Sequence, residues 1–209
     1  MEGYSAYQLY VDGGGFMHPI LFLFIFGLAI SLERLWTLTR ANVNPKKFMS
    51  KIKKAIEEGG IDAALEVCAN TRGPLASIIS AGLLRADRGI DQVEKAIVNA
   101  GSVEMAFLEK NLVWLATVIA LAPMLGFLGT VWGMILAFKA IEAANDISPS
   151  VVAGGISVAL ITTLFGLVVA IVIQTFHNFF VSRIDKLIID MEESSVELVE
   201  TLIVKQKAR

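Results

Sequence analysis

Three long stretches without a charged residue limit what this chain can fold into. No Asp, Glu, Lys or Arg occurs within residues 13–32, 111–138 or 147–182. A helix needs roughly 20 mainly apolar residues to cross the hydrocarbon core of a membrane, so each stretch is long enough. The composition agrees, since 18% of the residues are charged, against about 25% in soluble domains. We therefore expect an all-α membrane protein with three transmembrane helices.

The basic residues predict how these helices are oriented. Seven follow the first uncharged stretch closely, against the lone acid Glu33: Arg34, Arg40, Lys46, Lys47, Lys51, Lys53 and Lys54. Five more follow the third stretch: Arg183, Lys186, Lys205, Lys207 and Arg209. Basic residues near a span favour the cytoplasmic side, and no Lys or Arg precedes the first stretch. We predict a multi-pass membrane protein with its N-terminus outside and its C-terminus in the cytoplasm.

Aromatic residues fit the same orientation. Tyr4, Tyr7 and Tyr10 lie at helical spacing before the first span, where they form either an interfacial anchor or a loosely ordered terminus. Trp36 and Trp114 are expected near the inner interface. Because the N-terminal residues lack a basic region, a cleaved signal peptide is not expected, and the first span should stay in the protein.

The domain organisation follows from these spans and from Gly and Pro punctuation. We expect an outer N-terminal segment 1–15, transmembrane helix 16–38, cytoplasmic helical domain 39–110, transmembrane helix 111–139, outer loop 140–148, transmembrane helix 149–182 and cytoplasmic helix 183–209. Breaks are expected at Gly59-Gly60, Gly73-Pro74 and Arg88-Gly89. Residues 91–110 should continue into the second span as one long helix. The third span should extend beyond Ser182, with an apolar stripe that needs a partner helix in this chain or in another copy.

The sequence offers no catalytic, metal or cofactor site, so an enzyme is not expected. His18 and His177 are isolated, and each is better explained as an interfacial polar residue than as a ligand or base. The single cysteine, Cys68, is expected to be a buried apolar residue. A net charge of −2 gives no reason to expect a nucleic-acid partner.

Small and hydroxylated residues gather on one face of the second and third spans. Gly126, Gly129 and Gly133 surround Thr130, and the third span carries Gly155, Ala159, Thr163, Gly166 and Ala170 at helical spacing, with Thr162 and Ser157 beside them. Glycine faces allow helices to pack closely in lipid. Alternatively, Thr130, Thr163, Thr162, Ser157 and Ala159 line a narrow polar path, while Gly126, Gly129, Gly133, Gly155 and Gly166 pack the helices.

An ion path through these spans would lack a titrating group of its own. Proton-coupled membrane proteins place an ionisable residue within the membrane, and this chain has no acid or base deep in any span. A hydroxyl can bind a carboxylate but cannot hold a charge near neutral pH. If the chain carries ions, another polypeptide must therefore supply the acid.

Two segments resemble a known family. Residues 122–134, APMLGFLGTVWGM, resemble the second-span motif of the family of ExbB, TolQ and, more distantly, MotA, and residues 151–167 resemble its third span. Three spans favour ExbB or TolQ over MotA. The resemblance implies a homopentamer around an ExbD- or TolR-like single-span partner whose membrane Asp carries protons and faces Thr130 and Thr163. It further implies a motor in the bacterial inner (cytoplasmic) membrane, with the N-terminus and residues 140–148 in the periplasm, that converts the proton motive force into work on a TonB- or TolA-like protein.

The chain departs from this family at Val158, where ExbB and TolQ usually carry Glu. The alternatives are a sodium-driven variant of the motor, since hydroxyl and carbonyl oxygens also suit Na⁺, and a structural membrane scaffold that conducts no ions.

Overall fold

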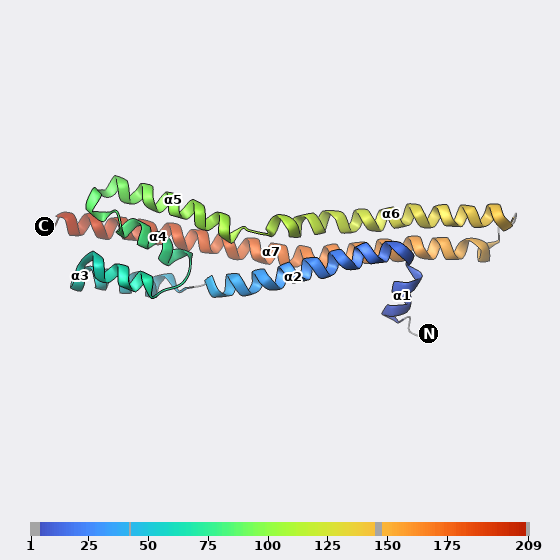
Figure 1. Ribbon diagram of the computed structural model, residues 1–209, viewed down its shortest axis with the longest axis horizontal. Helices are drawn as coiled ribbons and strands as arrows, with labels where there is room; N and C mark the ends of the chain where they lie inside the picture. Colours follow the sequence, from blue (N-terminus) through green and yellow to red (C-terminus); the bar gives the residue numbers. More distant parts are fainter. Residues whose placement is uncertain (1–4, 42, 145–147, 208–209) are drawn as a thin grey trace. The chain divides into compact units, whose positions relative to one another are not determined.

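The computed structural model describes residues 5–41, 43–144 and 148–207, and every regular element in these ranges is a helix (Figure 1). Three helices are long and apolar enough to cross a membrane. The predicted all-α class is thus confirmed, and three helices have the length and apolar composition that the predicted spans require. The described residues divide into two compact units, which we call the membrane unit (within 1–33 and 111–178) and the helical unit (within 34–110 and 179–209).

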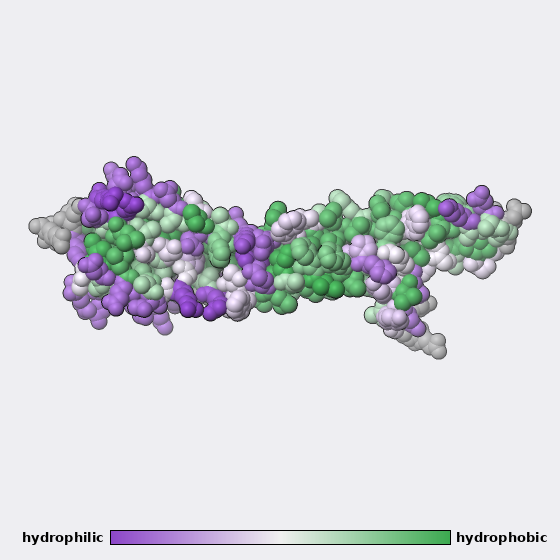
Figure 2. All heavy atoms as spheres, viewed as in Figure 1, coloured by the Kyte–Doolittle hydropathy of each residue, from purple (hydrophilic) through white to green (hydrophobic). Residues whose placement is uncertain are grey.

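The membrane unit is a bundle of three long helical segments. It contains α1 (Ala6–Asp12), η1 (Gly14–Phe16), the first part of α2 (Met17–Ala41), α6 (Leu112–Ala144) and the first part of α7 (Pro149–Lys207). Its outer face is apolar: Phe22, Phe127 and Leu160 are each about two-thirds exposed. Figure 2 shows hydrophobic residues over most of the visible face of this unit. Such a surface suits contact with lipid and not with water.

The short helix α1 carries two of the three tyrosines that precede the first span. Ser5 and Gln8 form a capping box that starts the short helix α1. Tyr10 in α1 makes a ring contact with His18, with centroids 5.6 Å apart, whereas Tyr7 is largely exposed. The third predicted tyrosine, Tyr4, lies outside the described residues.

The helical unit contains the end of α2, then α3 (Pro45–Ala69), α4 (Pro74–Leu83), η2 (Ala86–Arg88), α5 (Ile90–Leu108) and the rest of α7. All three predicted breaks occur. The helix α3 bends at Gly60 (φ 78°), α4 begins after Gly73 (φ 122°), and α5 begins after Gly89 (φ 95°). Only glycine adopts these positive φ angles without strain, so these glycines set the boundaries.

Apolar side chains from α3, α4, α5 and α7 fill the core of the helical unit. Ile52, Ile79, Val93 and Leu198 are completely buried, one from each helix. A Cβ on Gly82 of α4 would lie 2.9 Å from Ile97 of α5 and 3.1 Å from Leu198. The apolar stripe of α7 therefore finds partner helices within its own chain.

One predicted continuity is wrong. The helix α5 ends at Leu108 and α6 begins at Leu112, because Asn111 adopts a left-handed conformation (φ 68°) that interrupts the helix. Asn is among the few residues besides glycine that enter this conformation regularly. By contrast, the predicted extension of the third span is confirmed, since α7 continues without interruption from Pro149 to Lys207.

Candidate functional site

The helices α6 and α7 of the membrane unit meet along a seam of glycines. A Cβ on Gly133 would lie 2.5 Å from the carbonyl oxygen of Gly155, and one on Gly166 would lie 2.6 Å from that of Ala122. A Cβ on Gly126 would lie 2.9 Å from the carbonyl oxygen of Thr162. Real Cβ atoms are not found so close to backbone, so the two main chains touch directly. We call this contact the glycine seam.

Close backbone contact is the form of helix packing that lipid favours. Because lipid tails are as apolar as leucine, helices in a membrane gain little from burying large side chains and associate through close packing and hydrogen bonds. Glycine removes the side chains that would separate the two axes.

Two threonines face each other across the glycine seam. The hydroxyl of Thr130 on α6 forms a short hydrogen bond with the hydroxyl of Thr163 on α7. Both side chains are half-buried in the single chain. We call this the threonine pair; it can be reached from outside the two helices.

Backbone carbonyls hold the threonine pair in place. Both hydroxyls lie within hydrogen-bond distance of the Ala159 carbonyl oxygen, at 3.1 Å from Thr130 and 3.2 Å from Thr163. The Gly126 carbonyl oxygen is the second shared acceptor, at 3.3 and 3.2 Å. Each hydroxyl has one proton and two lone pairs, so the pair keeps unused acceptor capacity after its own bonds are made. An added carboxyl group could donate to it, or accept from it after a hydroxyl rotates.

The side chains of the other predicted path residues do not belong to the threonine pair. Thr162 is completely buried, packs where a Cβ on Gly129 would fall, and donates within its own helix to the carbonyls of Val158 (2.9 Å) and Ala159 (3.1 Å). Ser157 is exposed on another face of α7. Ala159 is buried and contributes its carbonyl oxygen to the threonine pair, not its side chain.

Neither histidine of the chain is hydrogen-bonded to the threonine pair within the described residues. His18 lies 3.2 Å from the carbonyl oxygen of Gly15, and the Nδ1 atom of His177 is buried with no hydrogen-bond partner in the described part of the chain. No cluster of three His, Cys, Asp or Glu residues able to hold a metal occurs among the described residues. In the helical unit, burial raises the pKa of the Cys68 thiol from 9.0 to about 11, which keeps it neutral.

Sequence reasoning did not identify the carbonyl oxygens of Gly126 and Ala159 as parts of the site. The type of a residue does not predict which main-chain carbonyl oxygen accepts a hydrogen bond from a neighbouring hydroxyl. A partial signal exists, because both residues lie four positions before a threonine of the pair, at the spacing where a helical Thr bonds back to the chain.

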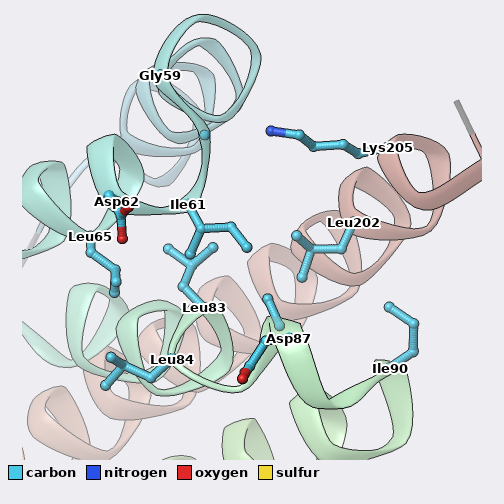
Figure 3. A pocket seen from close by; sticks show the side chains of 12 residues that line it. Gly59, Ile61, Asp62, Leu65, Leu83, Leu84, Asp87, Ile90, Leu202 and Lys205 are labelled. Atoms are coloured by element: carbon cyan, nitrogen blue, oxygen red, sulfur yellow. The ribbon is translucent and has the colours of Figure 1, made fainter. Parts of the chain in front are cut away.

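A cavity lies in the helical unit beside the bend of α3. Its wall includes Asp62, Leu84, Asp87 and Leu202, and its volume is about 680 Å³ (Figure 3). The ammonium group of Lys205 at its edge donates to the carbonyl oxygen of Ile56 at 2.5 Å. This contact places a cation at the end of the first half of α3, where helix carbonyls lack partners.

Comparisons with known proteins agree with the resemblance. A family profile described as the MotA/TolQ/ExbB proton channel family matches residues 70–193, which include α6, the glycine seam and the threonine pair. A biopolymer transport protein ExbB homolog from Methanothermobacter thermautotrophicus is 33% identical over 199 residues, which is 95% of this chain and 69% of that protein.

Two further relatives match shorter segments. The Tol-Pal system protein TolQ of Pseudomonas aeruginosa is 37% identical over 102 residues, 49% of this chain and 44% of that protein. The biopolymer transport protein ExbB of Xanthomonas campestris is 43% identical over 88 residues, 42% of this chain and 35% of that protein.

Proposed function

From the premise that the chain belongs to the MotA/TolQ/ExbB proton channel family, we propose that it is the helix-bundle subunit of an ion-driven motor in the bacterial inner membrane. Five copies surround the transmembrane helix or helices of an ExbD- or TolR-like partner. The proton motive force then drives motion that a TonB- or TolA-like protein uses for outer-membrane transport or envelope maintenance. One charge crossing 100 mV releases roughly 2.3 kcal/mol, which sets the scale of work per proton.

The threonine pair is the observation that carries this proposal. Thr130 and Thr163 lie half-buried between two spans that contain no acid, with acceptor capacity to spare. A carboxylate in mid-membrane costs roughly 2.5–3.5 kcal/mol on insertion scales, and hydroxyl partners reduce that cost. A partner's Asp beside the threonine pair would be hydrogen-bonded both as the acid and as the carboxylate, so it could take up and release a proton.

Neighbouring threonines give the experiment its matched control. Thr130→Val and Thr163→Val keep the side-chain shape and remove the hydroxyl. We expect each to abolish growth that depends on energised outer-membrane import, at normal protein level. Thr162→Val should retain function, because the Thr162 hydroxyl bonds only within α7. Undiminished import in the Thr130→Val and Thr163→Val strains would refute the role of the threonine pair.

A structural scaffold without ion conduction is the second candidate, because the glycine seam by itself explains why α6 and α7 carry small residues. Purification together with the products of the neighbouring genes distinguishes a motor subunit from a scaffold. A motor subunit should copurify with a single-span protein that carries a membrane Asp, whereas a scaffold should be stable alone.

The ion is tested on the reconstituted complex with its partner. Our proposal of protons predicts a flux that a pH gradient drives and that persists when choline replaces Na⁺. A flux that requires Na⁺ and ignores the pH gradient would instead identify the sodium-driven variant.

A further inference from the structure

The helical unit contains a cavity of about 340 Å³ where the end of α2, the start of α4 and the end of α5 meet. We call it the arginine cavity, because Arg40 and Arg72 lie in its wall together with Gly73, Glu104 and Phe107. Cavities of this size commonly hold a small ligand or headgroup. Neither the glycine seam nor the threonine pair contributes to it.

The two arginines of the cavity are available to bind an anion. Neither forms an ion pair with any residue that the structure describes, and both are exposed. The guanidinium carbon of Arg40 lies 4.9 Å from the ring centre of Trp36, an arrangement that orients the charge. Guanidinium groups bind phosphate oxygens through paired N–H donors, so two of them in one wall favour an anionic ligand such as a phosphate over a neutral or apolar one.

The start of α4 adds to the positive potential of the cavity. No side chain caps the first turn of α4, and Gly73 before it packs against α2, since a Cβ there would lie 3.0 Å from the Ala41 carbonyl oxygen. Helix N-termini carry a partial positive charge and bind phosphates through their amides. The first turn of α4 therefore adds to the attraction that the two arginines exert on an anion.

The arginine cavity includes residues of α2 that closely follow the first uncharged stretch in the sequence. The uncharged stretch of α2 ends at Leu32, and Arg34 and Arg40 are roughly 9 Å apart along the same helix axis. Helical side chains tilt toward the N-terminus, so Arg40 points back toward the span, as its contact with Trp36 demonstrates. Exposed tryptophans at this level belong to the lipid headgroup layer.

A carboxylate in the same wall selects among headgroups. Glu104 is half-buried in the cavity and pairs with no described cation. Two cations and one anion together complement a headgroup that carries a phosphate and a primary ammonium group. We propose that the arginine cavity binds an aminophospholipid of the adjoining leaflet, with the phosphodiester on Arg40 and Arg72 and the ammonium on Glu104. The proposal does not depend on ion conduction.

Competitive lipid binding to the full-length protein tests this assignment. The delipidated protein in detergent is incubated with equal amounts of phosphatidylethanolamine, phosphatidylglycerol and phosphatidylcholine of the same acyl chains, and native mass spectrometry counts the retained lipids. We expect phosphatidylethanolamine to predominate, because the quaternary ammonium of phosphatidylcholine cannot donate hydrogen bonds to Glu104. Combined Arg40→Gln and Arg72→Gln should lower its retention by about tenfold, the effect of losing two exposed charge-assisted bonds.

Matched variants distinguish lipid bound in the arginine cavity from lipid bound along the spans. Arg85→Gln with Arg88→Gln removes the same charge from exposed positions near η2 and should leave retention unchanged. Glu104→Gln should remove the preference for phosphatidylethanolamine over phosphatidylcholine while both still bind. Equal retention by the Arg40/Arg72 and Arg85/Arg88 variants would overturn the proposal. Preference for phosphatidylglycerol would also overturn it, as would full displacement by equimolar inorganic phosphate, which would identify a site for soluble phosphate.

Discussion

At the scale of single residues, the glycine seam divides neighbouring glycines into two kinds. A Cβ on Gly155 would lie 2.5 Å from the Gly133 carbonyl oxygen and 2.6 Å from the Ala137 nitrogen, both backbone atoms that cannot move aside cheaply. A Cβ on Gly154, the adjacent residue, would meet nothing within 4 Å. Position on the helix and not residue type therefore decides which glycine is needed.

This difference makes a paired prediction. Gly155→Ala should lower the unfolding free energy of the detergent-solubilised protein by about 1–3 kcal/mol, because it forces α6 and α7 apart. Gly154→Ala should be neutral or slightly stabilising, since alanine favours helix over glycine. Unfolding by titration with a denaturing detergent, followed by circular dichroism, measures both. Equal stability of the two variants would contradict the glycine seam.

The buried thiol of Cys68 makes a prediction about pH. Its pKa is raised from 9.0 to about 11 in the folded protein, so at pH 8 its thiolate fraction is about 100-fold lower than in the unfolded chain. Iodoacetamide should therefore modify the native protein far more slowly than the denatured protein, as mass spectrometry would record. Because the folded pKa is the higher one, the thiol's contribution to stability is complete below pH 9 and is lost between pH 9 and about 11. Cys68→Ala should lack this loss, and comparable alkylation rates in native and denatured protein would count against burial.

At the scale of helices, the end of α7 is held by packing more than by charge. Leu198 is completely buried, whereas the neighbouring ion pair, Glu197 with Lys53 at 2.6 Å, has both side chains about 40% exposed. Exposed ion pairs typically contribute less than about 1 kcal/mol. Removing a fully buried leucine side chain costs about 2–5 kcal/mol.

We therefore expect Leu198→Ala to loosen the helical unit and Glu197→Gln to leave it nearly unchanged. Hydrogen exchange of α4 and α5 amides, measured by mass spectrometry, reports the free energy of local opening. The expected loss is about 2–4 kcal/mol for Leu198→Ala and below about 1 kcal/mol for Glu197→Gln. A larger effect from Glu197→Gln would assign the anchoring of α7 to electrostatics.

Comparison with the sequence shows which helix features can be predicted. The spans follow from the absence of charge, and the breaks at Gly60, Gly73 and Gly89 follow from glycine's tolerance of positive φ. The break at Asn111 could not be predicted, because Asn occupies both helical and left-handed conformations and no Gly or Pro marks the site.

The candidate site also has features that the sequence does not predict. Sequence spacing identifies a small and hydroxylated face but does not separate Thr162 from Thr163, which differ by one residue, or about 100° around the helix. Only the placement of α6 decides that Thr163 meets Thr130 while Thr162 packs beneath Gly129.

At the scale of the whole molecule, the three spans require the termini to lie on opposite sides of the membrane. We propose that the N-terminus is periplasmic and the helical unit cytoplasmic, because many basic residues closely follow the first span and no Lys or Arg precedes it. Two exposed positions suit a test of this orientation: Val11 in α1 and Ser102 in α5.

In a Cys68→Ala background, Val11→Cys should react with a membrane-impermeant maleimide in cells whose outer membrane has been opened. Ser102→Cys should react only after the inner membrane is also broken. Gel shift of the labelled protein measures both, with total labelling in detergent as the reference. The reverse pattern would invert the topology and place the helical unit outside the cytoplasm.

The glycine seam has a consequence for how this protein tolerates change. Because main chain rests on main chain where α6 crosses α7, the separation of the two hydroxyls is set by atoms that every amino acid possesses. Apolar residues that are exposed in the single chain, such as Phe127 and Leu160, lie outside the glycine seam, so exchanging them for other apolar residues should not disturb that spacing. Substitutions over most of the bundle surface would therefore leave the geometry of the threonine pair intact, so relatives with low sequence identity can keep the same contact between α6 and α7.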